Sequence, residues 1–66
     1  MAEQKVITIS KDMALADRIS VVSREITQWL ESLEEPFNME LDVMRLAKCE
    51  GNGAYIYHYV IDRSVR

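Results

Sequence analysis

The sequence predicts an α+β fold in which one long helix packs on a three-stranded antiparallel sheet, in the element order strand, helix, strand, strand. An apolar seam at helical spacing occupies the first half of the chain, and an Asn-Gly turn joins two strand-like segments in the second half. The last segment is apolar on both sides, as expected of a strand covered on each face. We therefore expect sheet order 1-3-2 and a single small domain, residues 1–66.

The first strand is predicted at Val6–Ile9, where every side chain is β-branched. Branching at Cβ restricts χ1 and favours extended backbone over helix. Ser10 and Asp12 follow, and either side chain can accept a hydrogen bond from the free N–H groups at the start of a helix. A short strand that leads into a capped helix is therefore expected.

The helix is predicted from Asp12 to Glu34, a length of about six turns. Pro36 sets its end, because the residue before a proline is biased out of the helical region. Apolar residues recur along this segment at alternating steps of three and four, which places them on one side of the helix. We expect this seam to form the core, and it consists of Leu15, Ile19, Val22, Ile26, Trp29 and Leu33.

The second strand is predicted to begin with the alternation of apolar and polar residues from Phe37 to Val43. Beyond Val43 the apolar positions change parity, to Met44 and Leu46. A one-residue change of parity moves side chains to the other face of a sheet. We therefore expect a β-bulge or a change of partner near Val43 and Met44.

The third strand is predicted at Ala54–Asp62, joined to the second by a tight turn at Asn52-Gly53. Asn and Gly tolerate the positive φ angles that a two-residue hairpin turn requires. Centring the turn there fixes the register and puts three cross-strand pairs on one face, which are Leu46 with Tyr59, Met44 with Ile61 and Lys48 with Tyr57.

The small size of the chain favours self-association. A domain of 66 residues buries only about 60% of the surface that its unfolded chain exposes. One helix covers one face of the sheet, so the other face would expose apolar side chains. We predict a homodimer or larger oligomer in which two sheets pack face to face through Arg45, Ile56, His58 and Val60, or join at their edges into a longer sheet. The alternative is that Arg45 and His58 keep the face solvated.

Charge and hydropathy exclude several classes of partner. The net charge of −3 disfavours nonspecific binding to nucleic acid or to anionic lipid. No apolar run approaches the ~20 residues of a membrane span, and the first residues lack the pattern of a signal peptide. We predict a cytoplasmic protein, where the single thiol of Cys49 stays reduced.

No catalytic, metal or cofactor site is expected. Cys49 and His58 share a sheet face and could in principle activate a thiolate, but no third group is evident to orient the histidine. One cysteine and one histidine are too few for a structural zinc site. The length and element order of the chain are similar in outline to those of dodecins, which are small flavin-binding oligomers. That resemblance implies an aromatic residue on the middle strand, but this chain has Val43 to Leu46 there.

Two groups of residues are predicted to contact a protein partner. Tyr55 and Tyr57 lie near the turn, and tyrosine rings offer large contact area at little entropic cost. The other group crowds the C-terminal end of the helix, where carboxylates oppose the helix dipole, and it consists of Glu31, Glu34 and Glu35. A cationic partner, or Arg63 or Arg66 of a neighbouring protomer, would compensate these charges.

These observations predict a small noncatalytic protein-interaction module, such as a homo-oligomeric adaptor, inhibitor or regulatory subunit. Its partners would be a second copy and an unidentified protein that binds an acidic surface bearing tyrosines. The alternative is a small-molecule or cofactor binder that uses a pocket between protomers, with Arg45, His58 and tyrosine side chains as polar contacts.

Overall fold

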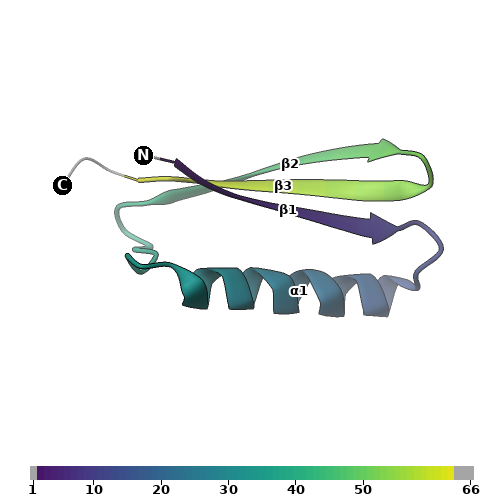
Figure 1. The fold of residues 1–66 in the computed structure, drawn as a ribbon, viewed down its shortest axis with the longest axis horizontal. Helices are drawn as coiled ribbons and strands as arrows, with labels where there is room; N and C mark the ends of the chain where they lie inside the picture. The colour runs from purple at the N-terminus through teal and green to yellow at the C-terminus, as the bar shows by residue number, and fades with distance from the viewer. Residues whose placement is uncertain (1, 64–66) are drawn as a thin grey trace.

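The computed structural model describes residues 2–63, which form one helix and a three-stranded sheet (Figure 1). The helix lies on one face of the sheet, and the elements follow the predicted order. They are β1 (Ala2–Ser10), α1 (Leu15–Ser32), β2 (Val43–Gly51) and β3 (Ala54–Asp62).

The sheet confirms the predicted topology. Its strand order is β1-β3-β2, and β3 pairs antiparallel with both neighbours. The β2–β3 register contains the three predicted pairs, Leu46 with Tyr59, Met44 with Ile61 and Lys48 with Tyr57. At the turn, Asn52 and Gly53 have φ angles of 50° and 75°, the positive values that a tight hairpin of this kind needs.

Three element boundaries differ from the sequence prediction. β1 extends beyond Val6–Ile9 to nine residues, because it pairs along its whole length with β3. α1 begins at Leu15 with Ala14 as its N-cap and no side-chain cap. Ser10 does not cap the helix, because its hydroxyl accepts a hydrogen bond from the Asp12 N–H in the turn that precedes the helix.

The segment predicted to open the second strand is a loop, so the predicted bulge near Val43 and Met44 is not needed. The backbone before Val43 folds into a turn in which the Asp42 N–H bonds the Asn38 carbonyl at 2.8 Å. The alternation of apolar residues from Phe37 therefore does not reflect a strand. The parity of the apolar residues changes at Val43 because β2 begins there.

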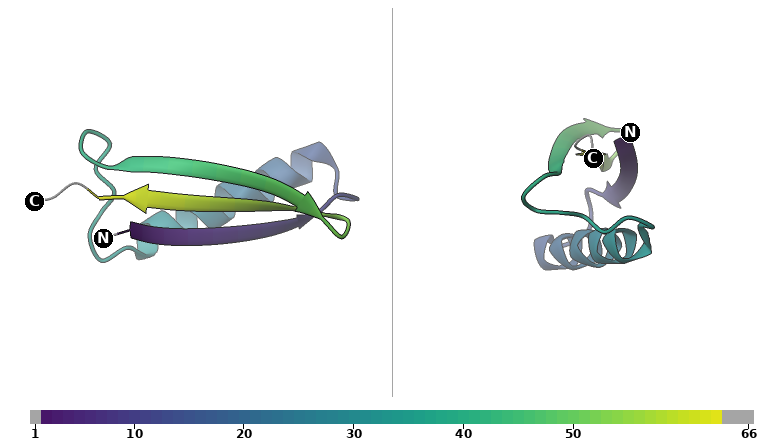
Figure 2. Two further views of the ribbon diagram at one scale, coloured as in Figure 1. Left: turned by 90° about the horizontal axis from the view of Figure 1, so that it is seen from above. Right: turned by 90° about the vertical axis from the view of Figure 1, so that its left-hand side faces the viewer.

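The core is small and lies between the sheet and α1. Its fully buried apolar side chains are Ile7, Ile9 and Ile61, all on the helix side of the sheet. α1 crosses beneath the sheet at an angle, so that its C-terminal half lies near β1 and its first turn projects past β2 (Figure 2). None of the eighteen α1 residues, all within the described range, is fully buried.

The apolar seam therefore faces the sheet but is covered unevenly. Leu15 and Ile19, at the N-terminal end of the seam, are 62% and 58% exposed. The accessible surface of 4860 Å² exceeds the about 4300 Å² expected for a compact monomer of this mass. The radius of gyration, 13.2 Å, likewise exceeds the about 11 Å expected. The chain leaves more surface in water than a compact domain of its mass usually does.

Arg63 joins three separate segments at one end of the molecule. Its guanidinium donates to the carboxylates of Glu3 at 2.6 Å and Asp42 at 2.8 Å, and to the carbonyls of Glu35 at 2.6 Å and Pro36 at 3.0 Å. The Asp42 side chain is fully buried and that of Arg63 is 7% exposed. The hydrogen bonds that Arg63 donates to Glu3 and to Asp42 raise the pKa of Arg63 above its ordinary value, against desolvation, which lowers it. This network ties the start of β1 and the α1–β2 loop to the end of β3.

We expect the stability of the domain to depend on Ile61 much more than on Leu15. Ile61→Ala should lower the free energy of unfolding by about 2–5 kcal/mol, because a fully buried side chain leaves a cavity. Leu15→Ala should cost less than about 1 kcal/mol, because most of that side chain is already in water. Urea unfolding at low protein concentration measures both, and equal costs would show that the helix packs differently.

Arg63→Lys should lower the Tm by at least about 5 °C. A lysine keeps the charge but cannot present the planar fork that reaches four acceptors at once, so the buried Asp42 loses part of its compensation. Thermal unfolding followed by circular dichroism is the measurement. Arg24→Lys, on the exposed outer side of α1, is the matched control and should leave the Tm unchanged. Equal melting of the two variants would mean that the network contributes no stability.

Candidate functional site

Tyr55 and Tyr57 lie on the helix side of β3, at the hairpin end of the sheet. Three cations surround the Tyr55 ring, with the nitrogen of Lys48 at 4.9 Å, the guanidinium carbon of Arg18 at 5.3 Å and the nitrogen of Lys11 at 5.4 Å from the ring centroid. Cations at such distances are attracted to the face of an aromatic ring. The tyrosines predicted as partner contacts therefore stand among cations, although the chain as a whole is acidic and Glu50 forms an ion pair with Lys11 at 3.2 Å.

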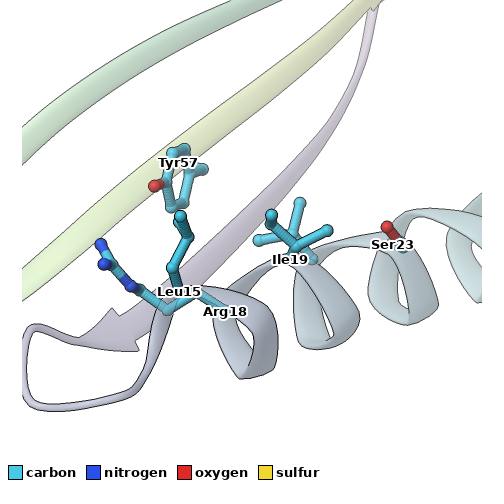
Figure 3. Close-up of a pocket in the computed structure, with 6 residues that line it drawn as sticks. Leu15, Arg18, Ile19, Ser23 and Tyr57 are labelled. Carbon is cyan, nitrogen blue, oxygen red and sulfur yellow. The ribbon is translucent and has the colours of Figure 1, made fainter.

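A groove opens beside these tyrosines, between α1 and β3. It encloses about 210 Å³ and is lined by Leu15, Arg18, Ile19, Val22, Ser23 and Tyr57. Leu15, Arg18 and Ile19 rise from the helix toward Tyr57, which points down from the strand (Figure 3). The floor of the groove is thus apolar. The guanidinium of Arg18 and the hydroxyl groups of Ser23 and Tyr57 stand at its rim. We call this site the α1–β3 groove.

Arg18 is the polar residue of the groove whose hydrogen bonding within the fold is least complete. Its Nε atom is buried and has no hydrogen-bond acceptor within residues 2–63. A buried donor without an acceptor costs free energy, and such atoms are rare in folded proteins. The groove therefore offers exposed apolar surface beside a guanidinium with which an acidic group could pair.

The acidic residues predicted to act with the tyrosines lie at the opposite end of the molecule. Glu31 is sixteen residues beyond Leu15 on α1, a rise of about 24 Å along the helix axis. Glu34 and Glu35 follow it in the loop, and all three are exposed. A single chain thus holds two separate surfaces, one basic with tyrosines and one acidic.

Arg63 binds acceptors of its own chain, including the Glu35 carbonyl, at this acidic end. The predicted pairing of Arg63 with a neighbouring protomer is therefore wrong in this structure, because the guanidinium is already enclosed by its own loop. Arg66, the other predicted partner, lies outside the described residues.

The acidic end carries a rigid turn that the sequence analysis missed, Asn38–Asp42, which we call the Met39 turn. The Asn38 side chain accepts from the Glu40 and Leu41 N–H groups at 2.9 and 3.2 Å. Asp42 accepts from the Asn38 N–H at 2.9 Å and is held by Arg63. At its tip, Met39 is 87% exposed. The signal for this turn in the sequence was the pair Asn38 and Asp42, four residues apart, because Asn and Asp side chains hydrogen-bond nearby backbone groups in turns.

The open face of the sheet brings together the residues predicted for self-association. Arg45, His58 and Val60, with Asp62, line a shallow hollow of about 310 Å³, and Ile56 lies two residues along the same strand. The polar members have partners within the chain, since Arg45 forms an ion pair with Asp62 and the His58 Nε2 hydrogen-bonds Gln4 Oε1 at 2.8 Å. This face is half-buried along β3 and exposed at Val6 and Val43.

The Cys49–His58 pair gains no support from the geometry. His58 turns its Nε2 toward Gln4 on β1, away from β2, where Cys49 is exposed. Within residues 2–63 no group of three or more His, Cys, Asp or Glu side chains is placed to hold a metal ion. In the same range, no helix combines the length and hydropathy that a membrane crossing requires.

Tyr59 is the tyrosine that packs closest to the core. Partial burial, and to a smaller extent the neighbouring Tyr57, raise the pKa of Tyr59 above its ordinary value. It pairs across the sheet with Leu46, as predicted, although Leu46 is 52% exposed because α1 does not reach beneath this part of β2. Tyr59 is thus a packing residue, whereas Tyr57 faces the groove.

Comparison with known proteins identifies no relative of this chain. No family model, no curated protein and no solved structure matches the chain. The case for a function therefore rests on the surfaces described above.

Proposed function

We propose that this chain is a small noncatalytic protein-interaction module, a homo-oligomeric adaptor, inhibitor or regulatory subunit. The observation that carries the proposal is the α1–β3 groove with its basic, tyrosine-bearing rim. Leu15 and Ile19 hold large apolar side chains in water there, beside aromatic and cationic groups. Tyrosine, arginine and apolar side chains in one concave site are the composition of interface hot spots.

The two charged ends give the module complementary contact surfaces. The hairpin end presents Tyr55 and Tyr57 among Lys11, Arg18 and Lys48. The other end presents Glu31, Glu34 and Glu35, and the last turn of the helix contains no basic residue. Surfaces of opposite sign steer partners and fix their orientation.

A small-molecule binder is the second candidate, and the groove is the feature that favours it. Its volume of about 210 Å³ is below the about 300–1,000 Å³ of pockets that enclose drug-sized ligands. Leu46, on the same face of the sheet as Tyr57, adds exposed apolar surface on β2 outside the groove. A macromolecular surface covers such an extended area better than a small ligand does.

The open sheet face is proposed to join copies of the chain. Ile56 and Val60 lie at its centre, and the ion pair and the hydrogen bond of its polar residues are made within the chain. A partner sheet can therefore pack on this face without leaving Arg45 or His58 uncompensated.

The partner surface can be tested by photo-crosslinking in cells that naturally express the protein. A benzophenone side chain in place of Tyr55 should trap one defined protein in a covalent adduct, because that ring stands at the rim of the groove. The same group in place of Arg24, on the exposed outer side of α1, is the matched control. Adducts identical at both positions would contradict a partner site at this end.

Ile56→Asp should weaken self-association by at least about 30-fold, because a carboxylate buried between two sheets loses its hydration. Sedimentation equilibrium between about 1 and 100 μM measures the change. Gln28→Asp, an exposed position on α1, is the control and should have no effect. If both variants associate like the unmodified chain, the open face is solvated rather than an interface.

A further inference from the structure

We infer that the α1–β3 groove of one copy receives the Met39 turn of a second copy, in an antiparallel dimer with two such contacts. This contact uses a surface other than the open sheet face, and it rests on the proposed function, because it names a second copy as the partner that fills the groove. Three features carry it: the shapes of the two elements, their charges and their positions along β2.

The Met39 turn has the form of an inserting element. Among the described residues Met39 is the most exposed of the large apolar side chains, at 87%, although the backbone on both sides of it is held, because the Asn38 and Glu40 N–H groups donate to the side chains of Asp42 and Asn38. A turn that is rigid before binding loses little conformational entropy when it docks. The unbranched methionine side chain adapts to irregular apolar sites such as a floor of Leu15 and Ile19.

The charges of the two elements are complementary. Glu40 stands next to Met39 at the tip of the turn and is exposed. The groove presents Arg18, whose buried Nε has no acceptor within the described residues, and Lys48 lies close by at the Tyr55 ring. A carboxylate that follows the methionine into the groove would form a charge-assisted hydrogen bond with the guanidinium of Arg18, which lines it.

The positions of the two elements allow both contacts at once. The first turn of α1 and the α1–β2 loop both project beyond β2, at opposite ends of that strand, and the two views agree on this (Figure 2). A two-fold axis perpendicular to the sheet, beside the middle of β2, brings each element to its counterpart on the second copy. Such an interface is self-complementary and closed, so it ends at the dimer.

The free edge of β2 lies between the two contacts. Within residues 2–63, β2 pairs only with β3, so the N–H and C=O groups along its other edge have no strand partner. The same two-fold axis sets the two β2 edges side by side and antiparallel, where backbone hydrogen bonds can form between them. The dimer also brings the acidic end of one copy to the tyrosine end of the other.

The contact can be tested separately from the sheet face by sedimentation equilibrium in an Ile56→Asp background. This chain should still form dimers between about 1 and 100 μM. Adding Met39→Asp should raise its dissociation constant by about 100-fold, because a charge cannot enter an apolar floor. A monomeric Ile56→Asp chain, or a Met39→Asp variant that dimerises like its parent, would overturn the inference.

Charge reversal tests the orientation. Glu40→Lys and Arg18→Glu should each raise the dissociation constant by about 10-fold, and the double variant should recover most of the loss. Arg24→Glu is the matched control, on the side of α1 away from the groove. Additive losses in the double variant would contradict a direct pairing of these groups.

Disulfide trapping provides a measurement that needs no destabilising change. With Cys49→Ser in both chains, a Met39→Cys chain is mixed with an Ile19→Cys chain and oxidised. The mixed disulfide should form in preference to the one with Gln28→Cys, which lies on the opposite side of the helix from Ile19. Equal yields from Ile19→Cys and Gln28→Cys would overturn the inference.

Discussion

One helix of eighteen residues cannot cover a sheet whose three strands have nine residues each, and the rest of the structure depends on this constraint. α1 crosses the sheet at an angle, so the covered area is greatest near β1 and least beneath β2 (Figure 2). The fully buried core is accordingly limited to Ile7, Ile9 and Ile61. The exposed Leu15, Ile19 and Leu46 follow from the same geometry, and they form the surface on which the proposed functions rest.

Because the helix supplies so little burial, a polar network fixes the end of the molecule. Arg63 closes the α1–β2 loop onto the sheet through two carboxylates and two carbonyls. Its contact with the fully buried Asp42 also sets the Met39 turn, since the same carboxylate oxygen, Oδ2, accepts from the Asn38 N–H. The residue that completes the fold thus also holds the most exposed apolar side chain in place.

The sequence predicted the elements whose signals are local. Asn52-Gly53 fixed the hairpin and its register, because few residues other than Asn and Gly adopt those φ angles readily. The limits of β1 could not be predicted, because Glu3 and Lys5 are held by ion pairs to Arg63 and Glu25, far away in sequence. The loop at Phe37–Asp42 was mistaken for a strand, because side chains of Asn38 and Asp42 compete there for the backbone N–H groups.

The candidate site was predicted only in part, for a related reason. Tyr55 and Tyr57 were assigned to the correct face from the hairpin register, but the cations around them come from three elements. The sequence joined these tyrosines with the acidic helix end in one surface, whereas the chain keeps them apart by the length of the helix. A two-fold dimer in which each Met39 turn enters the other groove would reunite them across the interface. A two-fold symmetric dimer can therefore combine the tyrosines of one copy with the acidic helix end of the other in one surface, which a single copy cannot provide.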